Sequence, residues 1–277
     1  MPYRTLRLER HNDLATITLS RPEKRNAISP EMIADLLSAL DELEHGRTRA
    51  VILTGAGKAF CAGMDLSVLR AMAAKASRPA TTGEDGAQPS ESEEAALIGD
   101  ARRMAQLFLR FYSFPKPLIA AVNGHALAGG CGLATLCDFT LAVPEAQFGY
   151  TEVRIGFMPA LVALFLIRQI GEKCARDLLL SGRLLKAEEA RDLGLINEVV
   201  PRERLLDRAR ELASTLAESS PASLTATKGL MEELARQELN RQLEISIRAS
   251  ARMRTTADFR EGLSAFIEKR KPRWEGG

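Results

Sequence analysis

The feature that most constrains the fold is an alternation of short apolar runs with segments of helical pattern. "RAVILTGAG", "PKPLIAAVNG" and "FTLAV" are three such runs, and the first two end in glycine. Short runs of this kind, with few polar residues, are typical of strands that are buried on both faces of a parallel sheet. Because helical segments separate them, the sequence predicts an α/β fold with a largely parallel sheet.

The two ends of the chain have different patterns. "YRTLRLE" and "LATITLS" alternate in polarity and predict a hairpin. Ser29 and Pro30 are favourable N-cap and first-turn residues and predict a helix start. Toward the C-terminus the pattern becomes helical, and we expect helices from Pro221, over 237–252 and over 255–271.

These patterns suggest how the chain is divided. We expect an α/β core over residues 1–200 and a helical C-terminal subdomain over 201–277, without a linker between them. Within the core, "KASRPATTGEDGAQPSESEEAALIGD" is rich in Ser, Gly, Pro and acidic residues. We expect residues 75–100 to be a mobile loop, either a lid or an inert surface insertion.

Composition excludes several classes of protein. The chain has 277 residues and a net charge of +2, which is too small a basic excess for a general nucleic-acid binder. Since it shows neither an apolar run of membrane-spanning length nor a signal-peptide pattern at "MPYRTLRLERHNDL", we expect a cytoplasmic protein with no membrane partner. The cysteines form no CxxC pair and indicate no metal site; they are Cys61, Cys131, Cys137 and Cys174.

Two glycine-rich turns, "GAGKAFCAGMDL" and "NGHALAGGCGLATLCD", each lead from a predicted strand into a predicted helix. A helix start exposes unpaired backbone N–H groups, and glycine lets a ligand approach the backbone closely. Two such starts directed at one oxygen atom would form an oxyanion hole for a thioester enolate. Tight turns without a ligand, or a phosphate-binding loop, remain alternatives, although neither stretch fits GxxxxGK[ST] or a complete GxGxxG fingerprint.

Five stretches, in this order, carry a resemblance that spans nearly the whole chain: "RPEKRNAIS", "GAGKAFCAGMDL", "PKPLIAAVNGHALAGGCGLATLCD", "AQFGYTEVRIGF" and "AFIEKRKP". Together they resemble the enoyl-CoA hydratase/isomerase family, the crotonase superfamily. The resemblance implies a spiral of ββα turns followed by a helical C-terminal trimerisation subdomain. It further implies an acyl-CoA thioester substrate, a homotrimer or hexamer, and no metal or redox cofactor, since coenzyme A is part of the substrate.

The resemblance also implies roles for particular residues. The backbone N–H groups of Met64 and Gly129 would bind the thioester carbonyl oxygen, and Glu152 would transfer protons. Contacts with coenzyme A are implied at Lys24, Arg25, Ala27, Ala62, Asp65, Leu66, Phe266 and Lys269.

Gly132 is where this chain departs from many hydratases of the family, which carry a second glutamate there. Hydration needs a base for the water and an acid for the α-carbon, and two carboxylates share that work easily. Moving a double bond from the 3- to the 2-position needs one carboxylate, which takes a proton from C2 and returns it at C4. By this chemistry, a single Glu152 favours a Δ3,Δ2-enoyl-CoA isomerase over a hydratase.

The local sequence around Glu152 favours a hydratase instead. "TEVRIGF" with Gly132 resembles bacterial hydratases of the methylglutaconyl-CoA type in leucine degradation, whose substrates carry a second carboxylate. If this stretch is extended, Arg154 points to the same side as Glu152 and would bind that carboxylate; a structural ion pair is the alternative for Arg154. Tyr150 is a further candidate for the acyl pocket.

We therefore expect a hydratase that acts on a 2-enoyl-CoA, with the isomerase as the alternative. A third possibility is RNA binding, because some relatives of the methylglutaconyl group bind RNA and "EKRKPR" is a basic run. Such a run is more often a solvated helix end, so a nucleic-acid partner is the weakest of the three expectations.

Overall fold

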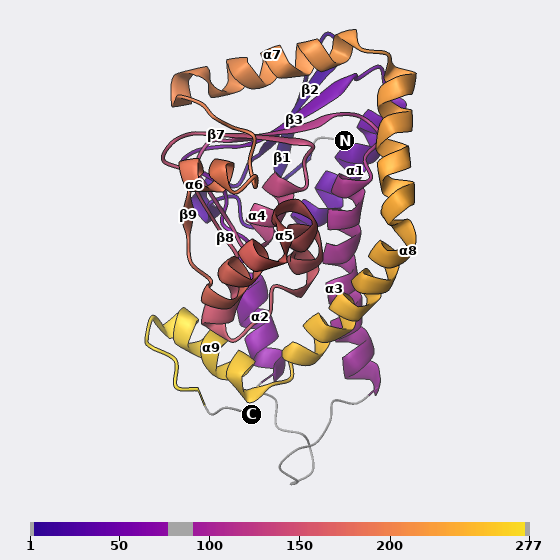
Figure 1. The fold of residues 1–277 in the computed structure, drawn as a ribbon. Coiled ribbons are helices and arrows are strands. Elements are labelled where there is room, and N and C mark those ends of the chain that lie inside the picture. The colour runs from indigo at the N-terminus through magenta and orange to yellow at the C-terminus, as the bar shows by residue number, and fades with distance from the viewer. Residues whose placement is uncertain (1–2, 77–90, 275–277) are drawn as a thin grey trace.

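The computed structural model describes residues 3–76 and 91–274, whose strands form two sheets (Figure 1). The larger sheet has the order β1-β2-β3-β5-β7-β10, with the bounds Leu6–His11, Leu14–Leu19, Ala50–Gly55, Leu118–Val122, Phe139–Ala142 and Glu198–Val199. The smaller sheet has the order β4-β6-β8-β9, with the bounds Ala59–Cys61, His125–Leu127, Gln147–Gly149 and Leu185–Lys186.

The chain winds between these sheets as a spiral. Strands β3, β5 and β7 lie in the larger sheet, and each is followed directly by a strand of the smaller one, β4, β6 or β8. Neighbours from β2 to β10 in the larger sheet are all parallel, and only β1 is antiparallel there. Helices close the turns: α2 (Leu66–Ala76), α3 (Glu91–Tyr112), α4 (Gly129–Thr135) and α5 (Ala160–Ser181). The predicted spiral of ββα turns with a largely parallel sheet is therefore confirmed.

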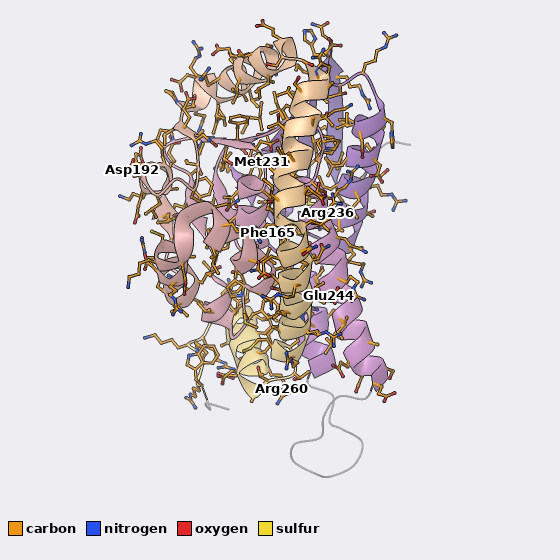
Figure 2. The ribbon with its side chains drawn as sticks, turned by 45° about the vertical axis from the view of Figure 1, so that its right-hand side comes forward. Phe165, Asp192, Met231, Arg236, Glu244 and Arg260 are labelled. Atoms are coloured by element: carbon orange, nitrogen blue, oxygen red, sulfur yellow. The ribbon has the colours of Figure 1, made fainter. Side chains whose placement is uncertain are left out.

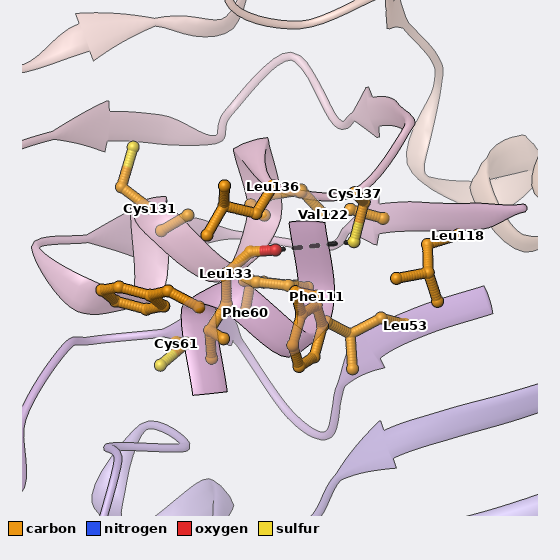
Figure 3. Packing of buried hydrophobic residues seen from close by; sticks show 14 of the residues in the cluster. Leu53, Phe60, Cys61, Phe111, Leu118, Val122, Cys131, Leu133, Leu136 and Cys137 are labelled. Atoms are coloured by element: carbon orange, nitrogen blue, oxygen red, sulfur yellow. Dashed lines mark hydrogen bonds between the residues drawn. The ribbon is translucent and has the colours of Figure 1, made fainter. Parts of the chain in front are cut away.

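Helix α4 is held inside the hydrophobic core rather than on its surface. Leu133 of α4 is fully buried and lies among Phe60, Phe111 and Val122 (Figure 3). The thiol of Cys137 donates a hydrogen bond of 3.5 Å to the carbonyl oxygen of Leu133. Because α4 is packed on all sides, the position of its first residues is fixed by the core.

Helix α1 (Pro30–His45) begins where the sequence predicts. The hydroxyl of Ser29 accepts a hydrogen bond of 3.2 Å from the backbone N–H of Met32, and Pro30 occupies the first helical position. The helix buries Leu36 and Leu40 against the sheet. This capped start fixes the loop that precedes it, which enters the site described below.

The predicted extent of the mobile loop, residues 75–100, is wrong at both ends, because helices occupy them. Helix α2 extends to Ala76, and α3 begins at Glu91, so residues 91–100 are helical. The acidic residues that suggested a loop, Glu91 and Glu93 among them, occupy the first turn of α3, where negative charge interacts favourably with the helix dipole. The rest of the expected loop, residues 77–90, lies outside the described residues.

Among the described residues after 201, the α-helices are α7 (Leu205–Glu218), α8 (Pro221–Met253) and α9 (Ala257–Glu268). The separate helices expected from Pro221 and over 237–252 are in fact the single helix α8, of 33 residues. Its first half is largely exposed, and its buried residues begin at Leu239, so no apolar periodicity joins the two halves in the sequence. Helix α8 packs beside α3, and α9 lies at the end of the molecule opposite α7 (Figure 1). No described helix is long and apolar enough to cross a membrane.

Candidate active site

A cavity of about 700 Å³ lies between the loop before α1, the start of α2, helix α3 and the C-terminal helices. Its wall brings together ten of the residues that the sequence singled out: Lys24, Arg25, Ala27, Ala62, Met64, Asp65, Leu66, Gly129, Glu152 and Phe266. These residues come from chain segments more than 200 positions apart in sequence, which only the spiral and the return of α9 bring to one place.

The two glycine-rich turns meet at the cavity. Gly63 has a φ of 88°, and a Cβ atom there would lie 3.0 Å from the Cβ of Ala128 and 3.8 Å from the nitrogen of Gly129. Strands β4 and β6, which lead into the turns, are parallel neighbours. The turns therefore contact each other directly, which their sequence spacing did not show.

Gly130 explains why so much glycine precedes α4. A Cβ atom at this position would lie 2.3 Å from the carbonyl oxygen of Cys61, a contact that real side chains do not make. Gly130 therefore lets α4 approach the β4 turn closely. Residue Ala128, just before the helix, has a φ of 50°, so the chain turns sharply as it enters α4.

Two backbone N–H groups in this wall are available to a ligand. Gly129 is the first residue of α4, so its N–H has no partner within the helix. Ile28 pairs with the β4–α2 turn by a parallel bridge that uses the carbonyl of Gly63, at 2.7 Å, and the N–H of Asp65, at 2.9 Å. In such a bridge the intervening N–H, that of Met64, points away from Ile28.

Glu152 has the chemistry of a proton-transfer group. It begins the short helix η2 (Glu152–Ile155), and its Oε2 is buried without a hydrogen-bond partner among the described residues. Burial raises the pKa of its carboxyl group to about 7, against the opposing effect of its own backbone N–H. The group can therefore both take up and release a proton near neutral pH.

The space beside Gly132 is filled by apolar side chains. A Cβ atom at this position would lie 2.7 Å from Cγ1 of Val162 and 3.2 Å from Cζ of Phe108. Both side chains line the cavity, whereas Gly132 is not part of its described wall. The place where a second glutamate would stand is thus occupied by hydrocarbon.

Tyr150 does not line the cavity, contrary to expectation. Its side chain is only 1% exposed, and its hydroxyl group lies 3.3 Å from Oγ1 of Thr135 in the core behind α4. Burial raises the pKa of Tyr150 well above its usual value. Tyr150 directly follows β8, whose alternation turns this side chain away from the cavity.

The expectation for Arg154 is also wrong, because the stretch after Glu152 is helical rather than extended. Side chains two positions apart in η2 do not share a face. Arg154 is exposed and lies in an adjoining surface depression with Leu184 and Arg270, which shares Thr151, Ile155 and Phe266 with the cavity wall but is not part of it. Lys269 is likewise exposed at the C-terminal end of α9 and is not in the described cavity wall, although Phe266 is.

Sequence reasoning missed Arg254, which lies in the cavity wall near Phe157 and Phe259. The signal was present in the sequence. Arg254 continues the spacing of three or four residues that joins Leu243, Ile247 and Ser250/Ala251 in the buried stripe of α8, so it falls where an apolar residue is expected. A cation on a buried stripe indicates a functional group or an unusual ion pair.

The comparisons with known proteins agree with this geometry. A model of the enoyl-CoA hydratase/isomerase family matches residues 9–277. A protein of Thermus thermophilus named "Putative enoyl-CoA hydratase" is 45% identical over 262 residues, 94% of this chain and 97% of its own. The 2,3-dehydroadipyl-CoA hydratase of Escherichia coli K12 is 34% identical over 271 residues, 97% of this chain and 98% of its own.

Solved structures give the same result. An enoyl-CoA hydratase/isomerase from Xanthobacter autotrophicus Py2 has a TM-score of 0.83 at 31% identity, covering 99% of this chain and 100% of that one. An enoyl-CoA hydratase from Mycobacterium avium has a TM-score of 0.81 at 29% identity, covering 98% of both chains. Both structures match nearly end to end, including the helices after residue 201. The chain has the crotonase fold and belongs to the enoyl-CoA hydratase/isomerase family.

Proposed function

We propose that this protein adds water to a 2-enoyl-CoA thioester, with Glu152 as both acid and base. The observation that carries the proposal is the carboxyl group of Glu152, whose Oε2 is buried and unpartnered among the described residues, in the same cavity wall as Met64 and Gly129. Its pKa of about 7 suits a group that must be ionised to start a reaction and protonated to finish it.

The N–H groups of Met64 and Gly129 form the oxyanion hole in this proposal. They donate hydrogen bonds to the thioester oxygen, which gains negative charge as the enolate forms. The Glu152 carboxylate takes a proton from water while the water oxygen bonds to C3 of the substrate. The C2–C3 double bond shifts its electrons toward the thioester, and the same proton then returns to C2.

Coenzyme A is proposed to bind along the mouth of the cavity. Lys24 and Arg25 are exposed there and supply positive charge for its phosphates, and Ala27, Ala62 and Leu66 leave room for its backbone. The carboxylate of Asp65 is already engaged with Arg21 and Ser67, so Asp65 would contact the ligand through its backbone. The half-exposed ring of Phe266 would cover the other side.

The isomerase alternative uses the same Glu152. The apolar surroundings of Gly132 favour it, because Val162 and Phe108 supply no second acid or base. In that reaction Glu152 takes a proton from C2 of a 3-enoyl-CoA and returns it at C4. The hydratase remains the first choice, since the relatives reported above are hydratases by name.

A carboxylated acyl group is the proposed substrate class. The name of the Escherichia coli relative supports it, since a dehydroadipyl group carries a second carboxylate. Arg154, the residue first considered for binding this carboxylate, lies outside the cavity. The positive charge for this carboxylate therefore comes from a different residue, and Arg254 in the cavity wall is the candidate.

We further propose that the chain assembles through its C-terminal helices into a homotrimer or hexamer. Leu230, Met231 and Leu234 of α8 are exposed apolar residues on neighbouring turns. Figure 2 labels Met231 among them on the outer side of α8. A monomer would leave this apolar surface in water, which favours covering it by another subunit.

The test is a mass-spectrometric assay in water enriched in ¹⁸O. Crotonyl-CoA, 3-methylglutaconyl-CoA and a 3-enoyl-CoA are offered separately to the wild-type protein and to Glu152→Gln. We expect ¹⁸O to enter the 2-enoyl substrates, and Glu152→Gln to lower the rate about 10²–10⁴-fold because the amide cannot transfer protons. The rate should rise with pH through about 7, as Glu152 ionises.

Each other outcome has a definite meaning. If only the 3-enoyl substrate changes, to its conjugated isomer and without ¹⁸O, the isomerase is correct and the hydratase is wrong. If Glu152→Gln retains full activity on every substrate, Glu152 is not the proton-transfer group. Glu23→Gln serves as the matched control, because Glu23 is an exposed carboxylate in the same cavity wall.

A further inference from the structure

Arg254 is a cation buried in the wall of the cavity without a satisfied hydrogen-bond shell. Its side chain is 3% exposed, and it follows the last turn of α8. Its Nε and Nη1 atoms are buried and have no hydrogen-bond partner within residues 3–76 and 91–274. Such unpaired groups are rare in folded proteins, because each loses its interactions with water and gains none in return.

The charges around Arg254 do not neutralise it. Nη1 lies 4.0 Å from Oδ2 of Asp100, which is too long for a hydrogen bond. Asp100 forms its closer ion pair with Arg103, so two guanidinium groups share one carboxylate. Phe157 covers another side, with its ring centroid 5.6 Å from the guanidinium carbon. Counting the described residues, this end of the cavity therefore has a surplus of positive charge.

Arg254 remains charged in spite of its burial. Burial lowers its pKa below the usual value, and Asp100 partly offsets the effect. An arginine starts from so high a pKa that it keeps its proton at neutral pH. A planar guanidinium with free N–H groups matches a carboxylate, which can accept two parallel hydrogen bonds from it.

The position of Arg254 in the cavity indicates where a matching ligand is apolar and where it is charged. Phe108, Met104 and Asp100 follow one another at four-residue spacing on α3 and all line the cavity. Phe108 lies against the Gly129 end, and Asp100 lies toward Arg254, about 12 Å further along the helix. The wall between them is apolar, with Met104, Phe157 and Phe259 among its residues. A matching ligand is apolar along its length and anionic at its far end.

We propose that Arg254 binds the distal carboxylate of a dicarboxylic acyl group whose thioester lies at Met64 and Gly129. This inference rests on the proposed acyl-CoA function, and it assigns to that function a selectivity for an ω-carboxylated chain. Arg254 thereby acts as a specificity-determining residue, and the ligand supplies the partner that its Nε and Nη1 lack.

The test measures binding rather than turnover. Isothermal titration calorimetry compares adipyl-CoA with hexanoyl-CoA, and suberyl-CoA with octanoyl-CoA. Within each pair the coenzyme A part and the carbon number are the same, and only the distal carboxylate differs. These saturated acyl groups cannot be hydrated, so the result does not depend on whether the protein is a hydratase.

We expect the wild-type protein to bind at least one dicarboxylic member more tightly than its neutral counterpart. Arg254→Met should lower the affinity ratio of acidic to neutral ligand by at least about 30-fold, since it removes one partner of a buried charge pair. Arg254→Lys should restore part of the ratio. Arg154→Met is the matched control, and its ratio should equal that of the wild type because Arg154 lies outside the cavity.

Three results would overturn the proposal. One is a wild-type protein that binds neither dicarboxylic member more tightly than its neutral counterpart. Another is an equal loss of affinity for both members in Arg254→Met, which would place the contact at coenzyme A itself. The third is no binding of any of the four ligands, which would overturn the proposed function as well. If Arg254→Met does not fold, as judged by circular dichroism, the Arg254→Lys ratio decides: a value identical to the wild type would contradict bidentate recognition.

Discussion

Two carboxylates in the same cavity wall, Asp65 and Glu152, have opposite surroundings. Oδ1 of Asp65 accepts hydrogen bonds of 2.8 Å from the backbone N–H and from the hydroxyl of Ser67. Oδ2 accepts a hydrogen bond of 2.5 Å from the guanidinium of Arg21. Glu152 has none of these partners at its buried Oε2 among the described residues.

The difference appears directly in their pKa values. Burial alone would raise the pKa of Asp65, but its bonds to Ser67 and Arg21 lower it below the usual range. Burial raises the pKa of Glu152 to about 7, since little opposes it. The comparison teaches that burial does not by itself mark a reactive carboxylate. A carboxylate suited to proton transfer is one whose surroundings leave the charged form unsatisfied.

The largest expected effect on folding comes from breaking the satisfied carboxylate. Asp65→Asn should lower the free energy of unfolding at pH 7 by about 2–3 kcal/mol, because Arg21 loses its partner and Ser67 loses a charged acceptor. The pKa of Asp65 is lowered by folding, so its contribution is present above about pH 4 and is lost as the pH falls further. Urea denaturation at pH 7 measures the change.

Glu23→Gln is the control for that measurement. Glu23 is exposed in the same wall, and its replacement should change stability by no more than about 0.5 kcal/mol. An Asp65→Asn protein as stable as Glu23→Gln would mean that the bonds to Arg21 and Ser67 do not stabilise the fold.

Replacing Glu152 should change the free energy of unfolding in the opposite direction. The unfolded carboxyl group ionises from about pH 4.5, whereas the folded one keeps its proton until about pH 7. Between these values the folded state binds more protons, so Glu152 destabilises the fold progressively as the pH rises from about 4.5 to 7. Glu152→Gln removes this cost and should raise the free energy of unfolding at pH 8 by about 1–3 kcal/mol.

This gain in the free energy of unfolding should disappear near pH 4, where the wild-type protein and Glu152→Gln both carry a neutral side chain at this position. Urea denaturation of the two proteins at pH 4 and pH 8 gives the four values that are needed. A loss of stability in Glu152→Gln at pH 8 would contradict the unsatisfied state of the carboxylate.

The smallest expected effect on stability comes from filling the space beside Gly132, where many relatives carry a second glutamate. Gly132→Ala places a methyl group 2.7 Å from Cγ1 of Val162. The steric conflict costs about 1–3 kcal/mol, and the better helix propensity of alanine returns about 1 kcal/mol, so the net loss is about 1 kcal/mol. Adding Val162→Ala to Gly132→Ala should cost less than Val162→Ala alone, as thermal denaturation of the three variants can show. Simple additivity would mean that the two positions do not share this space.

Much of the site was predictable because it lies close to the glycine motifs in sequence. The family resemblance, not the turns alone, implied Met64 and Gly129, and both lie within the two glycine-rich stretches that line the cavity. Gly130 shows why the motif is informative. The carbonyl oxygen of Cys61 lies too close to this position for any side chain, so a glycine is needed there and can be recognised in the sequence.

The remaining expectations failed where local backbone geometry or distant packing decides. The expectation for Arg154 assumed that the stretch after Glu152 is extended. That stretch is the short helix η2, so the side chains of Arg154 and Glu152 do not share a face. Arg254 was missed because its burial depends on α3 and on Phe157, which follows η2, packing against the end of α8. Similarly, α8 did not read as one helix, since half of it has no core to face.

The wall of the cavity runs in sequence from Glu23 to Phe266, nearly the full length of the chain. A nascent chain that has left the ribosome only as far as α8 contains both sheets and both glycine turns, yet its cavity lacks the side formed by Phe259 and Phe266. The ability to enclose an acyl-CoA therefore arises at the very end of synthesis.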